Sequence, residues 1–168
     1  MDIKDLKGAV LASSIYIDGK QVAVNATITL PEITPATTEV MGAGGTIELP
    51  VFSKLEAMEA SITLPGINGD VLKMLSPERH TLTANIVQQS VGADKSKAEH
   101  IKATLEVVPK TVPAIEATYG EAAETEHAFS VLSYKLAVGG KVVLKADPVK
   151  GIYKVNGRDY MNDIKKMI

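Results

Sequence analysis

The side chains that could support acid–base or metal chemistry are few and widely spaced in this sequence. The histidines are His80, His100 and His127, and there is no cysteine. A zinc site needs ligands at short intervals such as HExxH, and no histidine lies in such a motif. Glu56 and Glu59 come closest to a paired acid and base, but they fall on opposite faces of one predicted strand. The sequence therefore predicts no catalytic, cofactor-binding or metal-binding residues, and the protein is not expected to be an enzyme.

A glycine-rich segment from Met41 to Gly45 is the second candidate for a binding site. A phosphate-binding P-loop ends in Gly-Lys-Ser/Thr and leads into a helix. Here the glycines are followed by Thr46-Ile-Glu-Leu-Pro50, which fits neither requirement. The chain also lacks the GxSxG motif that presents a nucleophilic serine. The glycines therefore indicate a flexible loop and not a phosphate site.

Composition narrows the function classes further. The length of 168 residues fits one domain, residues 1–168, with an aliphatic core because aromatic residues make up only 4% and tryptophan is absent. The net charge of −2, without a basic run, argues against tight nucleic-acid binding. The absence of cysteine excludes disulfides and fits assembly in a reducing cytoplasm. The N-terminus lacks a signal-peptide core, and no apolar run is long enough to cross a bilayer, so we expect no direct membrane insertion.

Alternation of polar and apolar residues predicts that most of the chain forms antiparallel strands. Residues 21–30 place their apolar side chains at even positions, and residues 55–64 repeat the pattern. Tight turns are predicted at Asp18-Gly19, Gly139-Gly140 and Asn156-Gly157. The other expected strands are 9–17, 79–89, 100–108, 114–119, 128–138, 141–146 and 149–155. This pattern predicts a mainly β fold, an antiparallel β-barrel or sandwich of about eight strands.

Two short helices and one long loop complete the expected structure. A helix over 71–75 follows Asp70, which is placed to act as its N-cap or first-turn acid. The C-terminal helix has Asp159 in its first turn. Its single apolar face consists of Tyr160, Met161, Ile164, Met167 and Ile168. Between the first two alternating strands, residues 31–50 form a loop of about twenty residues, a length that usually serves a function outside the domain.

Four of the predicted strands, 21–30, 55–64, 79–89 and 100–108, each have one apolar face. In three of them the opposite face carries threonine, serine, asparagine and glutamine with almost no charge. One interpretation is an ordinary solvated sheet face. The other is a smooth wall past which a polyanion moves without binding, because a neutral or acidic wall does not attract phosphates.

The order of motifs along the chain is itself informative. The Asp18-Gly19 turn leads into a strand ending in Thr-Leu-Pro-Glu-Ile33, and the long loop contains Met41-Gly-Ala-Gly-Gly45. Leu55-Glu-Ala-Met-Glu-Ala-Ser-Ile62 and a short helix follow. The chain closes with Ser133-Tyr-Lys-Leu136, a glycine turn, a second strand and Val155-Asn-Gly-Arg-Asp159. Over nearly its whole length the chain resembles the major tail tube proteins of contractile-tailed phages, which R-type bacteriocin particles also use.

The resemblance implies a structural protein without enzymatic activity. In that family six copies form a ring, and rings stack into an inner tail tube that conducts DNA or ions to the target cell. The implied partners are further copies of the chain, a sheath protein outside, and a baseplate and tail terminator at the ends. DNA is expected only as non-specific cargo. The implied location is the bacterial cytoplasm during assembly, and then a virion tail or tail-like particle.

The resemblance also assigns roles to residues. Strands of neighbouring subunits join into an inner barrel, so the polar strand faces are expected to line its channel. The candidate lumen residues are Gln21, Asn25, Thr27, Thr29, Glu59, Ser61, Thr63, Thr81, Thr83 and Asn85. The 31–50 loop is expected to contact the next ring through Pro31, Ile33, Pro35, Val40, Met41 and Ile47. The strands at 128–138 and 141–155, with the C-terminal helix, are expected to form the outer layer.

Two alternatives remain open at this point. The first is the tube protein of a type VI secretion or extracellular injection system, which has the same architecture. The second is a stand-alone β-barrel that binds a small molecule. The low aromatic content argues against the second, because small-molecule pockets are usually lined by aromatic side chains.

Overall fold

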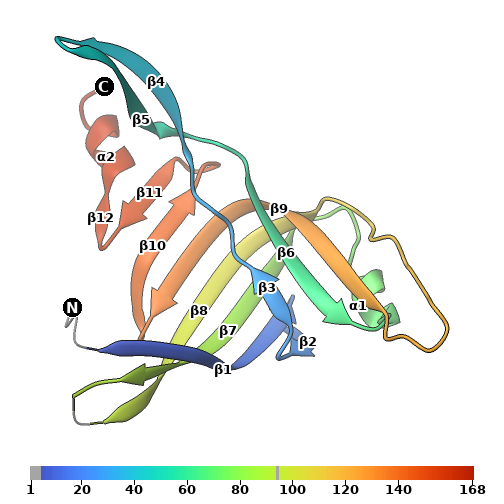
Figure 1. Cartoon of the computed structure of the whole chain (residues 1–168). Coiled ribbons are helices and arrows are strands. Elements are labelled where there is room, and N and C mark those ends of the chain that lie inside the picture. The colour runs from blue at the N-terminus through green and yellow to red at the C-terminus, as the bar shows by residue number, and fades with distance from the viewer. Residues whose placement is uncertain (1–4, 94) are drawn as a thin grey trace.

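The computed structural model of the protein describes residues 5–93 and 95–168 (Figure 1). These residues form twelve strands and two helices. The strands are β1 Leu6–Ile17, β2 Lys20–Val24, β3 Thr27–Thr29, β4 Pro35–Gly42, β5 Gly45–Leu55, β6 Met58–Pro65, β7 His80–Val91, β8 Ser96–Pro109, β9 Glu124–Val138, β10 Lys141–Asp147, β11 Ile152–Val155 and β12 Arg158–Asp159. The helices are α1 Gly69–Lys73 and α2 Tyr160–Lys165. The predicted mainly β, antiparallel fold is confirmed; residues 1–4, part of the signal-peptide argument, lie outside the described residues.

Ten of the described strands belong to one sheet that curls into an incompletely closed barrel. Its order is β12-β11-β10-β9-β8-β7-β1-β2, and β9 also pairs with β6, which pairs with β3. Strand β9 connects the two parts because β6 pairs with its first half and β10 with its second half. In Figure 1, β3 and β6 pass in front of the wall formed by β7 and β8. The remaining two strands, β4 and β5, form a separate hairpin.

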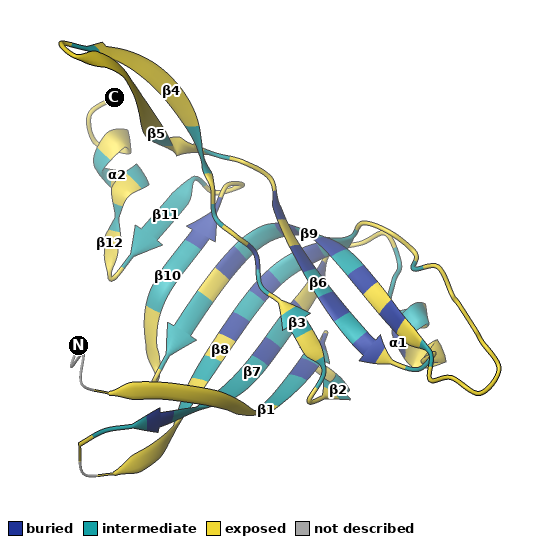
Figure 2. Ribbon diagram, viewed as in Figure 1, coloured by how far each residue is buried: buried dark blue, intermediate teal, exposed yellow. Residues whose placement is uncertain are grey.

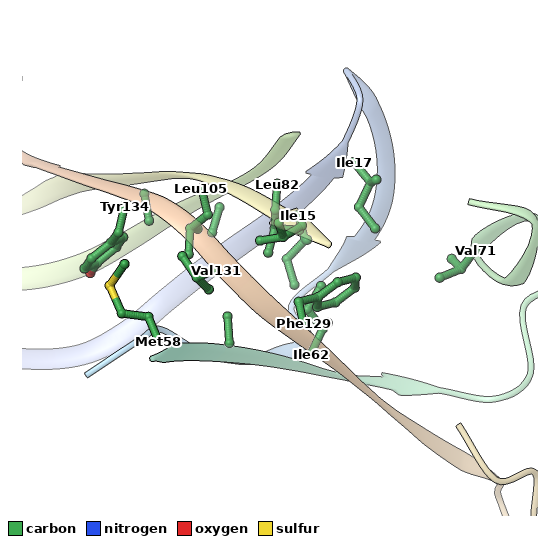
Figure 3. Close-up of a cluster of buried hydrophobic side chains, with 14 of the residues drawn as sticks. Ile15, Ile17, Met58, Ile62, Val71, Leu82, Leu105, Phe129, Val131 and Tyr134 are labelled. Atoms are coloured by element: carbon green, nitrogen blue, oxygen red, sulfur yellow. The ribbon is translucent and has the colours of Figure 1, made fainter. Parts of the chain in front are cut away.

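The core lies between the two walls of this curled sheet. Ile15, Leu82 and Leu105 come from one wall, and Met58 and Ile62 of β6 come from the other. Figure 3 shows these side chains pointing toward one another. Burial alternates along β6, β8 and β9, whereas β4 and β5 are exposed along most of their length (Figure 2). The aliphatic core that the composition predicts is confirmed, with Phe129 and Tyr134 as its buried aromatic members.

The predicted strand over 21–30 is broken at Asn25, and this part of the prediction is wrong. Asn25 has a φ of +54°, in the left-handed region that asparagine tolerates better than most residues. Its side-chain Oδ1 accepts a hydrogen bond from the backbone N–H of Ser13 at 3.0 Å. Before the break, β2 pairs with β1, and after it, β3 pairs with β6. One short segment thereby connects the two edges of the curled sheet.

A β-bulge interrupts the predicted alternation of 128–138. Val107 of β8 lies opposite Val131 and Glu106 lies opposite Ser133, so Leu132 is the extra residue. The bulge allows Val131 and Tyr134, three residues apart, to face the same core. The alternation predicted for 128–138 therefore breaks at Leu132, which is only partly buried.

Segment 31–50 is not an irregular loop, as predicted, but contains most of a regular hairpin. Strands β4 and β5 pair from Pro35↔Leu55 to Gly42↔Gly45 at the tip. Gly45 takes a φ of +147°, which a residue with a side chain rarely adopts, so the glycines serve the turn. The hairpin projects away from the curled sheet (Figure 1).

The strand predicted at 114–119 is absent from the described structure. Residues 110–123 have no regular secondary structure except a turn near Tyr119 and Gly120. Pro113 cannot donate a ladder hydrogen bond, and the side chains around it are largely solvent-exposed. The alternation there does not form a strand because none of the described strands pairs with it.

The turns were predicted more accurately than the helix ends. All three predicted two-residue turns have positive φ at both positions, for example 50° and 80° at Asp18 and Gly19, as hairpins with this twist require. Helix α1 begins at Gly69 with Asn68 as its N-cap, so Asp70 is the first-turn acid. Asp159 is the N-cap of α2 and not a first-turn residue. Neither helix of the described chain has the length and apolar character needed to span a membrane.

Candidate assembly surfaces

One arrangement in the structure has the order of a serine–histidine–aspartate triad. His80 Nδ1 lies 2.6 Å from Asp18 Oδ2, and His80 Nε2 lies 3.2 Å from Ser76 Oγ. However, Nε2 also lies 3.0 Å from the carbonyl oxygen of Ser76, so both ring nitrogens face acceptors. The hydrogen bond to Asp18 raises the pKa of His80, which favours the imidazolium that donates from both nitrogens. An Nε2 that donates to the Ser76 carbonyl oxygen cannot also accept the proton of the Ser76 hydroxyl, and the group instead ties the β1–β2 turn to the start of β7.

The other two histidines do not form a site either. His127 is buried, its Nδ1 has no hydrogen-bond partner in the described structure, and burial lowers its pKa, so it is neutral. His100 is exposed and pairs with Asn85 through Nε2 at 3.0 Å. Within residues 5–93 and 95–168, no three histidine, aspartate or glutamate side chains cluster closely enough to hold a metal ion.

Half of the candidate lumen residues lie together on the outer side of β3 and β6. We call this surface the threonine face, and it consists of Thr27, Thr29, Glu59, Ser61 and Thr63. Thr27 pairs with Thr63, and Thr29 pairs with Ser61. The Glu59 carboxylate forms an ion pair with Lys110 at 2.9 Å. Glu32 and Glu126 border the same face, in a groove of about 380 Å³, so the threonine face is polar to weakly acidic.

Other candidate lumen residues lie elsewhere. Thr81, Thr83 and Asn85 occupy the outer side of β7, on the wall across the core from β6. Gln21 is exposed on β2, and Asn25 lies at the break before β3. The structure therefore divides the predicted set between two walls whose outer sides point in opposite directions.

The outer side of β8 to β11 carries a surface that sequence reasoning missed. Lys135 pairs directly with Lys145, and Lys145 pairs directly with Lys154, so three lysines form one row across three strands. Lys102 lies one row away, opposite Ala137. We call Lys102, Lys135, Lys145 and Lys154 the lysine face. Among the ion pairs between described residues, none includes these four lysines.

The lysine face could not be found from composition because its members are scattered along a chain with a net charge of −2. Only the strand register brings them together. The signal in the sequence is a lysine at one phase of the polar–apolar alternation in each of four predicted strands, at 100–108, 128–138, 141–146 and 149–155. The bulges in β9 and β10 shift that phase, so the signal could be interpreted only once they were located.

The hairpin carries the other candidate contact residues. Val40 and Ile47 pair across β4 and β5 on one side, and Met41 lies on the other side with 82% of its surface exposed. Pro31 is buried, and Ile33 packs against the core below the hairpin. The structure thus separates the predicted set into residues that anchor the base and residues that project into solvent.

An aromatic cluster fixes the base of the hairpin to the C-terminal segment. Phe52 of β5 stacks on Tyr153 of β11 with ring centroids 5.8 Å apart and on Tyr160 of α2 at 6.3 Å. The guanidinium of Arg158 lies 5.0 Å from the Tyr160 ring centroid, at cation–π distance. Helix α2 leaves Ile164, Met167 and Ile168 exposed, so the C-terminal part of its apolar face is not covered by the described chain.

Strand β1 supplies one more unpartnered surface. Strand β2 pairs only with Ser14 to Ile17, so the first half of β1 has one backbone edge that no described strand covers. Leu6, Val10 and Leu11 are exposed in that half. Free strand edges and exposed apolar side chains are features that proteins usually cover by association.

Comparison with known proteins agrees with this arrangement. A chain in the cryo-EM structure of an extracellular contractile injection system, the PVC sheath–tube complex in the extended state, has a similar fold with a TM-score of 0.51 and 12% sequence identity. The similarity covers 74% of this chain and 87% of that chain. A search of curated proteins gives no match. The sequence model of the family described as phage tail tube protein FII matches residues 9–168, so the chain belongs to that family of structural tail tube proteins, as its motifs predict.

Proposed function

We propose that the protein is the repeating subunit of a contractile particle's inner tube, in which six copies form each ring and the rings stack inside a sheath. The observation that carries this proposal is the β4–β5 hairpin, which projects from the barrel with apolar side chains in solvent. Exposed apolar side chains usually mark a surface that another protein covers, and for a tail tube protein that partner is another subunit. The whole chain, 1–168, serves as one tail-tube domain.

Ring formation uses the free strand edges. The first half of β1 and the outer edge of β3 are both unpaired within the described subunit. A head-to-tail contact between different edges of neighbouring copies satisfies both, and it closes into a ring when the rotation per subunit fits. This contact extends the curled sheet from one subunit to the next.

The threonine face lines the channel in this proposal. It carries hydroxyl groups and carboxylates, and Lys110 beside it forms an ion pair with Glu59. The outer side of β8 to β11 carries the four lysines of the lysine face, which form no ion pair with other described residues and would bind a passing phosphate backbone. The channel lining therefore consists of Thr27, Thr29, Glu59, Ser61 and Thr63, and Thr81, Thr83 and Asn85 lie away from the channel. The cargo is DNA or ions, neither of which the threonine face retains.

The hairpin connects adjacent rings. Val40, Ile47 and Leu49 are about half-exposed in the subunit and become buried against the next ring. The aromatic cluster at Phe52 holds the hairpin in its projecting orientation before assembly. Assembly takes place in the bacterial cytoplasm, with the sheath outside the tube and a baseplate and terminator at its ends.

Negative-stain electron microscopy of the concentrated protein, together with its native mass, tests the proposal. Six-fold rings or hollow tubes are the expected result. A variant in which residues 37–49 are replaced by a short Gly-Asn turn should remain folded by circular dichroism but form no tubes. A chain that stays monomeric at high concentration would refute the assembly, and normal tubes from the shortened variant would refute the role of the hairpin.

The lining is tested by cysteine labelling, because the natural chain has no cysteine. In assembled tubes, a cysteine at Ser61 should react with small maleimides but not with maleimide attached to a bulky polymer. A cysteine at Thr83 serves as the control and should react with both. The reverse pattern would place the channel at the opposite wall.

A further inference from the structure

We propose that the lysine face is the docking site for the acidic side of the β4–β5 hairpin of a neighbouring copy of this chain. This inference rests on the proposed function, because it names the surface that receives the hairpin between rings. Two observations of like charges placed side by side lead to it, one on each surface.

The lysine face places three ammonium groups in one cross-strand row. Directly paired residues in an antiparallel sheet have Cβ atoms about 5 Å apart, and like charges at that distance destabilise the pair. Lys135, Lys145 and Lys154 occupy such positions, and none of them has a carboxylate partner within the described chain. Asp159 is in register with Lys154, but its Oδ1 accepts hydrogen bonds from the N–H groups of Met161 and Asn162. Asp159 therefore offers negative charge only at the Lys154 end of the row, and neither Lys135 nor Lys145 forms an ion pair within the described chain.

The hairpin carries the opposite arrangement. Glu39 of β4 pairs directly with Glu48 of β5, and both side chains are exposed. Neither takes part in an ion pair with another described residue. Two carboxylates in one cross-strand pair have the same cost as the lysines, and placing the two surfaces together removes both costs.

The patterns beside the charges also match. One row further along the hairpin, Met41 pairs with Thr46 on the same side as the glutamates. One row further along the lysine face, Ala137 pairs with Val142, and these two residues line an open groove of about 270 Å³ together with Lys102 and Lys135. Strand spacing is common to all antiparallel sheets, so seating the Glu39–Glu48 row on the Lys135–Lys145 row brings Met41 over the groove. Val142, 41% exposed, provides an apolar contact for Met41 there.

The opposite apolar side of the hairpin stays available for other contacts. Val40 and Ile47 point away from the glutamates because successive side chains of a strand alternate. The hairpin of one ring thus uses its charged side for register and its apolar side for burial. This division suits a contact that must select one position along a sheet, since charge complementarity contributes more to specificity than to affinity.

A charge swap in the full-length chain tests the docking site. The variants are K135E/K145E, E39K/E48K and a combined variant with all four substitutions. Each double variant should raise the lowest concentration that gives tubes by about tenfold or more, because like charges then meet across the interface. The combined variant should return to within about threefold of the natural chain. K20E/K73E is the matched control, since it makes the same charge change beside α1 and should leave assembly unchanged.

The rescue separates an interface from a folding defect, because the combined variant carries every substitution of the two double variants. Tubes from K135E/K145E at the natural concentration would overturn the proposal. A combined variant as defective as its parents would also overturn it. If the shortened hairpin blocks assembly while the charge swap gives no rescue, the hairpin connects rings but docks elsewhere. If the shortened variant forms normal tubes, the hairpin does not connect rings and the docking site fails with it, whereas a natural chain that forms no tubes would refute the proposed function itself.

Discussion

The curled sheet and the β4–β5 hairpin are built from the same alternating pattern, but they use it differently. In the sheet, the apolar side of each strand faces a second wall of the same chain, and residues such as Leu105 are fully buried. In the hairpin, Val40 and Ile47 form an equally regular pair that faces solvent. The comparison teaches that alternation predicts a face that will be buried, without saying whether the partner belongs to the same chain.

The largest expected effect on the free energy of unfolding comes from the core of the sheet. Phe129→Ala removes a fully buried ring between the two walls and should destabilise the subunit by about 3–5 kcal/mol. Urea denaturation of the purified protein measures this loss. A loss below about 1 kcal/mol would mean that the two walls do not share one core, and the contrast with the hairpin would disappear.

A smaller effect is expected at the junction between the two regions. Phe52→Ala removes the stacking on Tyr153 and Tyr160 and should destabilise the subunit by about 1 kcal/mol. Hydrogen exchange should show faster exchange in α2 and β5 with little change in β7 and β8. Uniformly faster exchange across the whole chain would show that the aromatic cluster supports the barrel and not the hairpin.

The Asp18–His80 pair should give the barrel a pH-dependent contribution of at most about 1 kcal/mol, since Asp18 is half-exposed and screened. The pKa of His80 is raised, so its contribution is complete below the ordinary histidine pKa of about 6.5 and is lost as pH rises through the folded-state value. The pKa of Asp18 is lowered, so its contribution is present above the ordinary aspartate pKa of about 3.9 and is lost on further acidification. Stability at pH 5.5 should therefore exceed stability at pH 9. His80→Gln should reduce that difference, and an unchanged pH profile would contradict the assignment.

The smallest effect on folding is expected in the hairpin, where the effect on assembly is largest. Ile47→Asp places a charge on a residue already 54% exposed, so the free energy of unfolding should change by no more than about 0.5 kcal/mol. Tube formation, measured by pelleting and microscopy, should be lost. Thr38→Asp, on the same side of the hairpin, makes the matched comparison and should have a weaker effect on assembly because it removes no apolar contact.

Much of the architecture was predictable because it depends on local chemistry. Turn residues such as Asp18 and Gly19 specify their own backbone conformation, and the inward positions of β6, β7 and β8 follow from alternation alone. The break at Asn25 and the bulge at Leu132 were missed, since both depend on which strand lies alongside. The long loop was misjudged for the same reason, because its threonines and valines form a hairpin only once the two arms pair.

The surfaces were less predictable than the core. Threonine and serine at outward positions identified the threonine face. They did not reveal that the outward side of β7 points in the opposite direction. The lysine face was invisible because its four members come from β8, β9, β10 and β11. Curvature of the sheet and strand order decide these features, and neither is encoded in a short segment of sequence.

The position of β9 also has a consequence for synthesis on the ribosome. Strands β6, β8 and β10 all pair with β9, which begins at Glu124, so no earlier segment can complete the core. At typical elongation rates, synthesis of the first 123 residues takes on the order of ten seconds, and β9 is absent during that time. The hairpin is made early in this interval, whereas the lysine face is completed only by the last strands. If the two dock as proposed, a nascent chain carries its projection before its receptor, which delays polymerisation until translation is nearly finished.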